Sequence, residues 1–148
     1  MPTLTESIAG WWSRFGDLTG QFQPQVGIAT ETAPRESPEW DTCIDELRKI
    51  RSDASVLGDT PPNATAIDAG LRWIAYLRTH CPTAPPTCII AEPGGGLIID
   101  RRVVLSDGRE SICELTFYND GRAELTAYLN GRVESLMDIS LNPETQVD

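Results

Sequence analysis

Carboxylates and arginines that could act together lie in the C-terminal half of the chain. Asp100 directly precedes Arg101 and Arg102, and Glu114 and Glu124 follow in segments where polar and apolar residues alternate. Two carboxylates that face each other across strands repel, which raises a pKa and suits general acid catalysis. These residues carry one hypothesis, a small hydrolase-like enzyme that uses sheet carboxylates with Arg101 or Arg102. An ordinary solvated sheet face has the same pattern, so we favour a non-catalytic protein and assign no catalytic residue.

The single histidine and the four cysteines offer little for metal or nucleophilic chemistry. His80 and Cys81 are adjacent and would chelate one ion poorly, and Cys88 and Cys113 lack the short paired spacing of zinc sites. The run Gly94-Gly95-Gly96 joins two predicted strands. A phosphate-binding loop would lead into a helix instead, so a hairpin turn is favoured. The sequence therefore predicts no metal site and no cofactor.

Two sets of residues are typical of protein-binding surfaces. In the first, apolar side chains recur every three or four residues near the N-terminus, and its candidate partner-binding residues are Trp11, Trp12, Phe15 and Leu18. This stripe either folds back onto its own domain or docks as a helix in a groove of a partner. The second set lies on the polar side of the predicted sheet and consists of Thr116, Tyr118, Thr126 and Tyr128. These residues either bind a partner or reflect the ordinary β propensity of Tyr and Thr.

A predicted α+β fold must position all of these side chains. Residues 1–22 form an amphipathic N-terminal segment, 23–36 a flexible linker rich in Pro and polar residues, 37–140 the α+β domain, and 141–148 a polar tail. Within the domain, the sequence Ser37-Pro38-Glu39 is typical of a helix start, and Gly58–Pro62 ends that helix. A second helix is predicted from about Asn63 to Thr79. The apolar period then changes from 3.6 to 2, which predicts strands at 88–92, 97–105, 110–118, 123–129 and 132–137.

The predicted strands are joined by turns of one kind. Asp107-Gly108-Arg109, Asp120-Gly121-Arg122 and Asn130-Gly131-Arg132 each contain a pair that adopts positive φ at low cost, as tight hairpins require. Three such turns in succession predict an antiparallel meander of four or five strands. One face is apolar and should take the two packed helices. The tethered amphipathic N-terminal helix precedes this domain.

This order of elements resembles a group of small bacterial α+β proteins. The resemblance rests on Asp59–Pro62, on the Ala-rich helix that follows, on the Pro-flanked strand and turn within 85–99, and on an Asp-Gly-Arg hairpin. It covers roughly residues 44–130 and consists of turn residues. The chain has Pro93–Gly96 where the group has Asp-Gly-Gly, and Asp100-Arg101 where Glu-Trp is common. No activity is attached to the group, so the resemblance implies a fold and a bacterial source.

Charge and composition exclude some classes of binding partner. The chain of 148 residues has 22 acidic and 12 basic side chains, a formal charge of −10, and residues 83–148 hold eleven of the acids against five bases. Such a chain is not attracted to nucleic acids or to anionic membranes. The first residues lack the basic opening and apolar run of a signal peptide, so we expect a cytoplasmic protein. We predict an accessory or adaptor subunit of a bacterial cytosolic complex that binds another protein. A basic partner is favoured, and a homodimer is left open.

Overall fold

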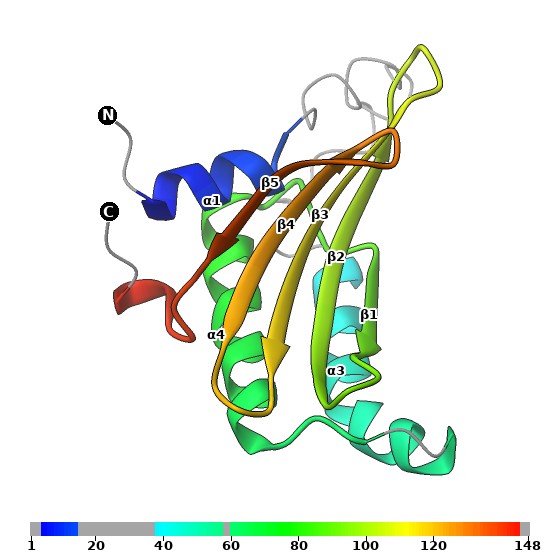
Figure 1. Ribbon diagram of the computed structural model, residues 1–148, viewed down its shortest axis with the longest axis vertical. Helices are drawn as coiled ribbons and strands as arrows, with labels where there is room; N and C mark the ends of the chain where they lie inside the picture. The colour runs from blue at the N-terminus through cyan, green and yellow to red at the C-terminus, as the bar shows by residue number, and fades with distance from the viewer. Residues whose placement is uncertain (1–3, 15–37, 58–59, 146–148) are drawn as a thin grey trace.

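A five-stranded antiparallel sheet forms the centre of the fold, and helices cover one of its faces (Figure 1). The computed structural model describes residues 4–14, 38–57 and 60–145. The elements in chain order are α1 (Leu4–Trp12), α3 (Pro38–Leu57), α4 (Ala64–His80), β1 (Cys88–Ala91), β2 (Gly96–Val104), β3 (Glu110–Tyr118), β4 (Ala123–Leu129), β5 (Arg132–Asp138) and the short 3₁₀ helix η3 (Pro143–Thr145). The predicted fold class is confirmed, and each predicted strand agrees with the structure to within one residue at either end.

The strands follow one another in the order β1-β2-β3-β4-β5, so every connection is a hairpin. The glycines of the three predicted turns have φ between 84° and 96°, as such turns require. In two of the turns the aspartate accepts a hydrogen bond from the backbone N–H two residues later: Asp107 from Arg109 at 3.0 Å, and Asp120 from Arg122 at 3.1 Å. The same arginines also pair with these carboxylates through their side chains. Each Asp-Gly-Arg turn is therefore stabilised by contacts of its own residues.

The two long helices begin where the sequence predicts. Pro38 opens α3, and acidic residues in its first turn complement the positive end of the helix dipole. Asn63 caps α4 by accepting a hydrogen bond from the Ala66 N–H at 3.0 Å. Asn63 is itself held by Asn119 in the β3–β4 turn, whose side-chain oxygen accepts the Asn63 N–H at 2.8 Å. The start of α4 is thus fixed to one end of the sheet.

The core lies between the sheet and the helices. α3 packs on β1, and α4 packs on β2 and β3 (Figure 1). Gly70 lets α4 approach β2 closely, since a Cβ at that position would lie 2.4 Å from Leu97 Cδ2. Three tryptophans are fully buried, and each indole N–H donates to a backbone carbonyl: Trp12 to Ala84, Trp40 to Pro82, and Trp73 to Ser140. The core therefore contains large aromatic side chains without unpaired indole groups.

The ends of the chain contact the same domain where they are described. Ile8 and Trp12 of α1 are fully buried in the core. Pro143 of η3 is buried, and η3 packs on α4, so this part of the predicted polar tail contacts the domain. The predicted linker 23–36 lies outside the described residues. None of the described helices is both long enough and apolar enough to cross a membrane.

Candidate functional site

The face of the sheet that turns away from the helices is here called the open face (Figure 1). Directly paired residues of antiparallel strands point to the same side, so the strand register assigns its residues. Three rows cross the sheet: Cys88, Asp100, Glu114, Thr126 and Leu136; Ile90, Ile98, Thr116, Glu124 and Asp138; and Arg102, Ile112, Tyr128 and Val133. Val104, Glu110 and Tyr118 continue the same alternation along β2 and β3.

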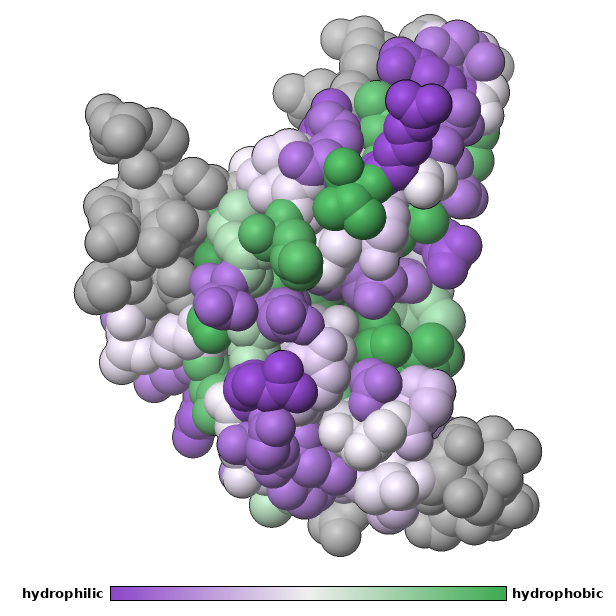
Figure 2. Space-filling view, in the orientation of Figure 1, coloured by the Kyte–Doolittle hydropathy of each residue, from purple (hydrophilic) through white to green (hydrophobic). Residues whose placement is uncertain are grey.

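The exposed apolar side chains gather on the open face. Four large hydrophobic residues are exposed in the described part of the chain: Ile90 (46 %), Val104 (67 %), Val133 (59 %) and Leu136 (62 %). The register places all four on the open face. Figure 2 shows apolar side chains lying between polar ones on the side of the molecule where the strands are in front. The apolar side chains of the opposite face are buried under the helices, so they do not contribute to the exposed apolar surface.

A pair of carboxylates lies at the centre of the open face. Asp100 of β2 is directly opposite Glu114 of β3. Although it lies on the open face, Asp100 is only 3 % exposed. Its Oδ2 lies 3.5 Å from Nη2 of Arg102, whereas its Oδ1 is buried and has no hydrogen-bond partner among the described residues. One oxygen of this carboxylate is therefore left without a donor.

The electrostatics of the pair follow from this burial. Desolvation raises the pKa of Asp100, and the nearby Arg102 opposes the shift only in part. Desolvation also raises the pKa of Glu114, and the negative charge of Asp100 raises it further. Cys88, next in the row, has a pKa above its ordinary value for the same two reasons, so its thiol stays protonated at neutral pH. The described residues contain no group of three ligands that could hold a metal ion.

The predicted Tyr and Thr residues all lie on the open face, but they differ in accessibility. Thr116 is buried, whereas Tyr118, Thr126 and Tyr128 are half-buried. The Tyr118 hydroxyl donates to Glu124 at 2.7 Å, and this bond raises the pKa of Tyr118 to about 12. The guanidinium of Arg122 lies 4.4 Å from the Tyr118 ring centroid. The Tyr118 side chain is thus held by neighbouring residues of the sheet, so Tyr128 and Thr126 are the better candidates of this set for contact with a partner.

The N-terminal stripe lies on its own domain in the structure, which corresponds to the first of the two alternatives. Trp12 is fully buried, and Trp11 is half-buried with the Arg14 guanidinium 5.0 Å from its ring centroid. Arg14 pairs with Glu134 of β5 at 2.6 Å. Phe15 and Leu18 lie outside the described residues. A partner could reach Trp12 only if α1 left the core, so docking through this stripe stays a prediction.

The two central arginines, Arg101 and Arg102, point to opposite faces because side chains alternate along a strand, and each has a partner. Arg102 pairs with Asp100 on the open face, and its side chain is 48 % exposed. Arg101 is 8 % exposed and donates to the carbonyl oxygens of Trp12 and Arg14 at 3.3 and 3.4 Å. Arg101 is buried at this position because carbonyl oxygens at the end of α1 accept hydrogen bonds from its guanidinium.

The structure brings together only some of the residues named in the enzyme hypothesis. Asp100 does face Glu114, but Glu124 lies opposite Thr116 and Asp138 instead. Arg101 lies on the covered face and cannot join the pair. The carboxylates stand on a sheet surface, and the described pocket is elsewhere.

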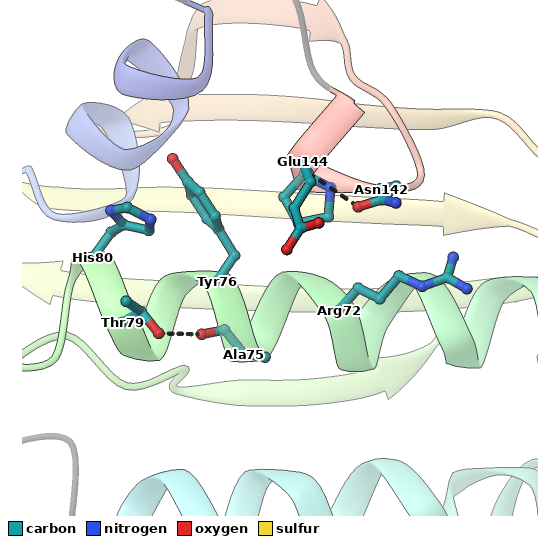
Figure 3. A pocket seen from close by; sticks show the side chains of 8 residues that line it. Arg72, Ala75, Tyr76, Thr79, His80, Asn142 and Glu144 are labelled. Atoms are coloured by element: carbon teal, nitrogen blue, oxygen red, sulfur yellow. Dashed lines mark hydrogen bonds between the residues drawn. The ribbon is translucent and has the colours of Figure 1, made fainter.

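That pocket lies between α4 and η3 and has a volume of about 410 Å³ (Figure 3). The rings of Tyr76 and His80 lie against each other with their centroids 4.1 Å apart and their planes tilted by 36°, and Asn142 and Glu144 line the opposite side. His80 is the last residue of α4, one residue beyond the predicted end of this helix at Thr79. Neither Asp100 nor Glu114 lines this pocket, so it gives no enclosure to the carboxylate pair.

The sequence singled out the carboxylates and the Tyr/Thr set, but it missed the exposed apolar residues Val133 and Leu136. Their spacing of three is unusual for a strand. It arises from a register irregularity opposite Ala127 and Tyr128, which brings both residues to the same face. No family model, curated protein or solved structure matches the chain.

Proposed function

We propose that this chain is a non-catalytic protein-interaction module, an accessory or adaptor subunit of a bacterial cytosolic complex, and that it binds its partner protein through the open face. One observation carries the proposal. The four exposed large apolar side chains of the described residues all lie on the single sheet face that the helices leave uncovered. An antiparallel sheet that meets only water on one side normally presents polar residues there.

The arrangement of the apolar residues supports a broad contact. Val133 and Leu136 lie on β5, Ile90 on β1 and Val104 on β2, so the set spans the sheet from edge to edge. Tyr128 and Thr126 lie between them. Apolar residues spread over one surface with Tyr among them are typical of protein interfaces. The residues of the described pocket do not belong to this face, which therefore suits a protein better than a small molecule, since small molecules prefer a concave site.

Charge indicates the chemistry of the partner. Of the charged residues that the register places on the open face, one is basic, Arg102, and five are acidic: Asp100, Glu110, Glu114, Glu124 and Asp138. A second copy of the chain would bring these carboxylates together through the same face. We therefore propose a basic surface of another protein as the partner.

Site-specific photocrosslinking tests the proposal. A photoreactive phenylalanine analogue replaces Leu136 on the open face, and in a matched control it replaces Ala75, which is exposed on α4. Crosslinking in cells of the source organism should trap one basic protein from position 136 and not from position 75. The pair Val133→Ser and Leu136→Ser should then weaken binding of that purified protein. Trapping of the same protein only from position 75 would overturn the proposal.

A further inference from the structure

We propose that the centre of the open face is an arginine-binding site, in which a guanidinium of the partner lies between Asp100 and Glu114 and replaces the contact of Asp100 with Arg102. This inference rests on the proposed function and adds to it the chemistry of the residue that anchors the partner. Three observations support it: the direct pairing of the two carboxylates, the unpaired Asp100 Oδ1, and the apolar surroundings of the pair.

The pairing sets a distance that one guanidinium can span. Asp100 and Glu114 are directly opposite on neighbouring strands, and Cβ atoms in such pairs are about 5 Å apart. Both side chains point to the open face. A guanidinium carries five N–H donors in a rigid plane, so it can donate to two carboxylates at once. An ammonium group is a compact charge without this fork, which favours arginine over lysine.

The unpaired oxygen shows that the site is incomplete in the isolated chain. Asp100 Oδ1 is buried without a donor among the described residues, a costly arrangement for a carboxylate. Arg102 approaches only Oδ2, and its distance of 3.5 Å exceeds the roughly 2.7–2.9 Å of a strong charge-assisted hydrogen bond. The Arg102 side chain is also 48 % exposed. It can therefore move aside at little cost and open a path to Asp100.

The residues around Asp100 and Glu114 would strengthen the binding of a cation by the two carboxylates. Ile98 and Ile112 are the next residues on the same face along β2 and β3, and both are half-buried. Leu136 lies in the same row as the pair, beyond Thr126. Apolar neighbours exclude water and lower the effective dielectric around an ion pair. An extended partner segment with one arginine between apolar side chains matches this surface.

A peptide titration of the full chain tests the site directly. The probes are Ac-Val-Arg-Val-NH2, the same peptide with lysine, and the same peptide with citrulline, which has the shape of arginine but no charge. Backbone amide NMR signals of β2 and β3 report binding. The arginine peptide should bind about tenfold more tightly than the citrulline peptide and more tightly than the lysine peptide. Equal affinity for arginine and citrulline, or for arginine and lysine, would overturn the inference.

Variants locate the binding. Asp100→Asn and Glu114→Gln each remove one charge of the pair, and Asp138→Asn is the matched control, an exposed carboxylate elsewhere on the same face. Either of the first two should reduce affinity for the arginine peptide about tenfold, whereas the control should retain it. An equal loss in all three variants would show diffuse attraction to an acidic surface and contradict a specific site. Unchanged amide spectra of the free variants verify the fold.

The failure of this inference can be separated from failure of the proposed function. If Asp100→Asn leaves crosslinking of the partner at position 136 intact, the open face binds the partner but the arginine site is wrong. If the arginine peptide binds as expected but no protein is crosslinked from position 136, the arginine-binding site is supported and the proposed binding of a partner protein is wrong.

Discussion

Asp100 shows how a single residue can place binding and stability in conflict. Its carboxylate is almost fully buried on a sheet face, opposite a second carboxylate and with one oxygen unpaired. An apolar or amide side chain at this position would stabilise the isolated domain. Residues that reduce stability in this way are common where a protein binds something, because the ligand supplies the missing interactions.

The stability of the fold should depend on the protonation of Asp100 and Glu114. The pKa values of Asp100 and Glu114 are both raised, so the folded state holds these protons more tightly than the unfolded state. Stability contributed by the two protonated groups is therefore present below their ordinary values of 3.8 and 4.5 and is lost as pH rises through the folded pKa values. As the pH falls from neutral through the folded pKa values toward these ordinary values, the two groups should become less destabilising.

Urea unfolding of the wild type and of the double variant Asp100→Asn, Glu114→Gln measures this effect. The double variant should be more stable than the wild type at pH 7, and the difference should shrink as the pH falls toward 4.5, the ordinary value for Glu114. Asp107 and Asp120 have lowered pKa values, so their contribution is lost only below their ordinary value of 3.8 and does not interfere. A double variant that is less stable at pH 7 would contradict the account of the pair.

At the scale of elements, α1 is the piece whose position decides between the two interpretations of the N-terminal stripe. Its sequence is weakly helical and includes Gly10, so the helix depends on what it packs against. The structure provides these contacts through buried Ile8 and Trp12, through Arg101 at its C-terminal carbonyls, and through the ion pair of Arg14 with Glu134.

Trp12→Ala should therefore destabilise the domain by about 3–5 kcal/mol, because it removes a fully buried aromatic side chain. It also removes the hydrogen bond from the indole to Ala84 O at 2.8 Å. Trp11→Ala, at a half-buried position of the same helix, should cost clearly less. Chemical denaturation of both variants measures the difference. If Trp12→Ala leaves the free energy of unfolding unchanged, α1 does not pack on its own domain in solution, and docking on a partner becomes the better interpretation.

The β1–β2 hairpin depends on a close approach at Gly96. A Cβ at this position would lie 2.4 Å from the backbone carbonyl oxygen of Phe117, which cannot move aside as a side chain can. Gly108, in the β2–β3 turn, has positive φ but open space around it. Gly96→Ala should therefore cost more stability than Gly108→Ala, for which backbone strain alone is about 1–2 kcal/mol. Thermal unfolding of the two variants tests the order, and equal costs would contradict it.

Most of these elements can be predicted from the sequence because the residues that begin helices and close turns act on their near neighbours in the chain. Asn63 caps α4, and the Asp-Gly and Asn-Gly pairs close the hairpins, each through contacts within a few residues. The burial of Arg101 could not be predicted in this way, since the carbonyls that it satisfies belong to residues 87 and 89 positions earlier. The shared face of Val133 and Leu136 escaped prediction because it depends on an irregularity in the β4–β5 pairing.

At the scale of the molecule, the open face combines two opposing tendencies. Its exposed apolar residues favour association, whereas its five carboxylates, on a chain with a formal charge of −10, oppose association with a copy of itself. The sequence indicated that the acidic residues concentrate in the C-terminal half. The sheet register shows that five of these acidic residues lie on the same face as the exposed apolar residues. Composition alone could not predict this arrangement.

This balance predicts that the charges keep the isolated chain monomeric. The triple variant Glu110→Gln, Glu124→Gln, Asp138→Asn removes three open-face charges and leaves Asp100 and Glu114 intact. It should self-associate more strongly than the wild type at about 0.15 M salt, where attraction between apolar residues remains and repulsion is reduced. Analytical ultracentrifugation over a range of concentrations measures the effect. Adding Leu136→Ser to the triple variant should restore the monomer, because it removes an exposed apolar side chain from the same face. A wild-type chain that dimerises through position 136 would show instead that the partner of the open face is a second copy.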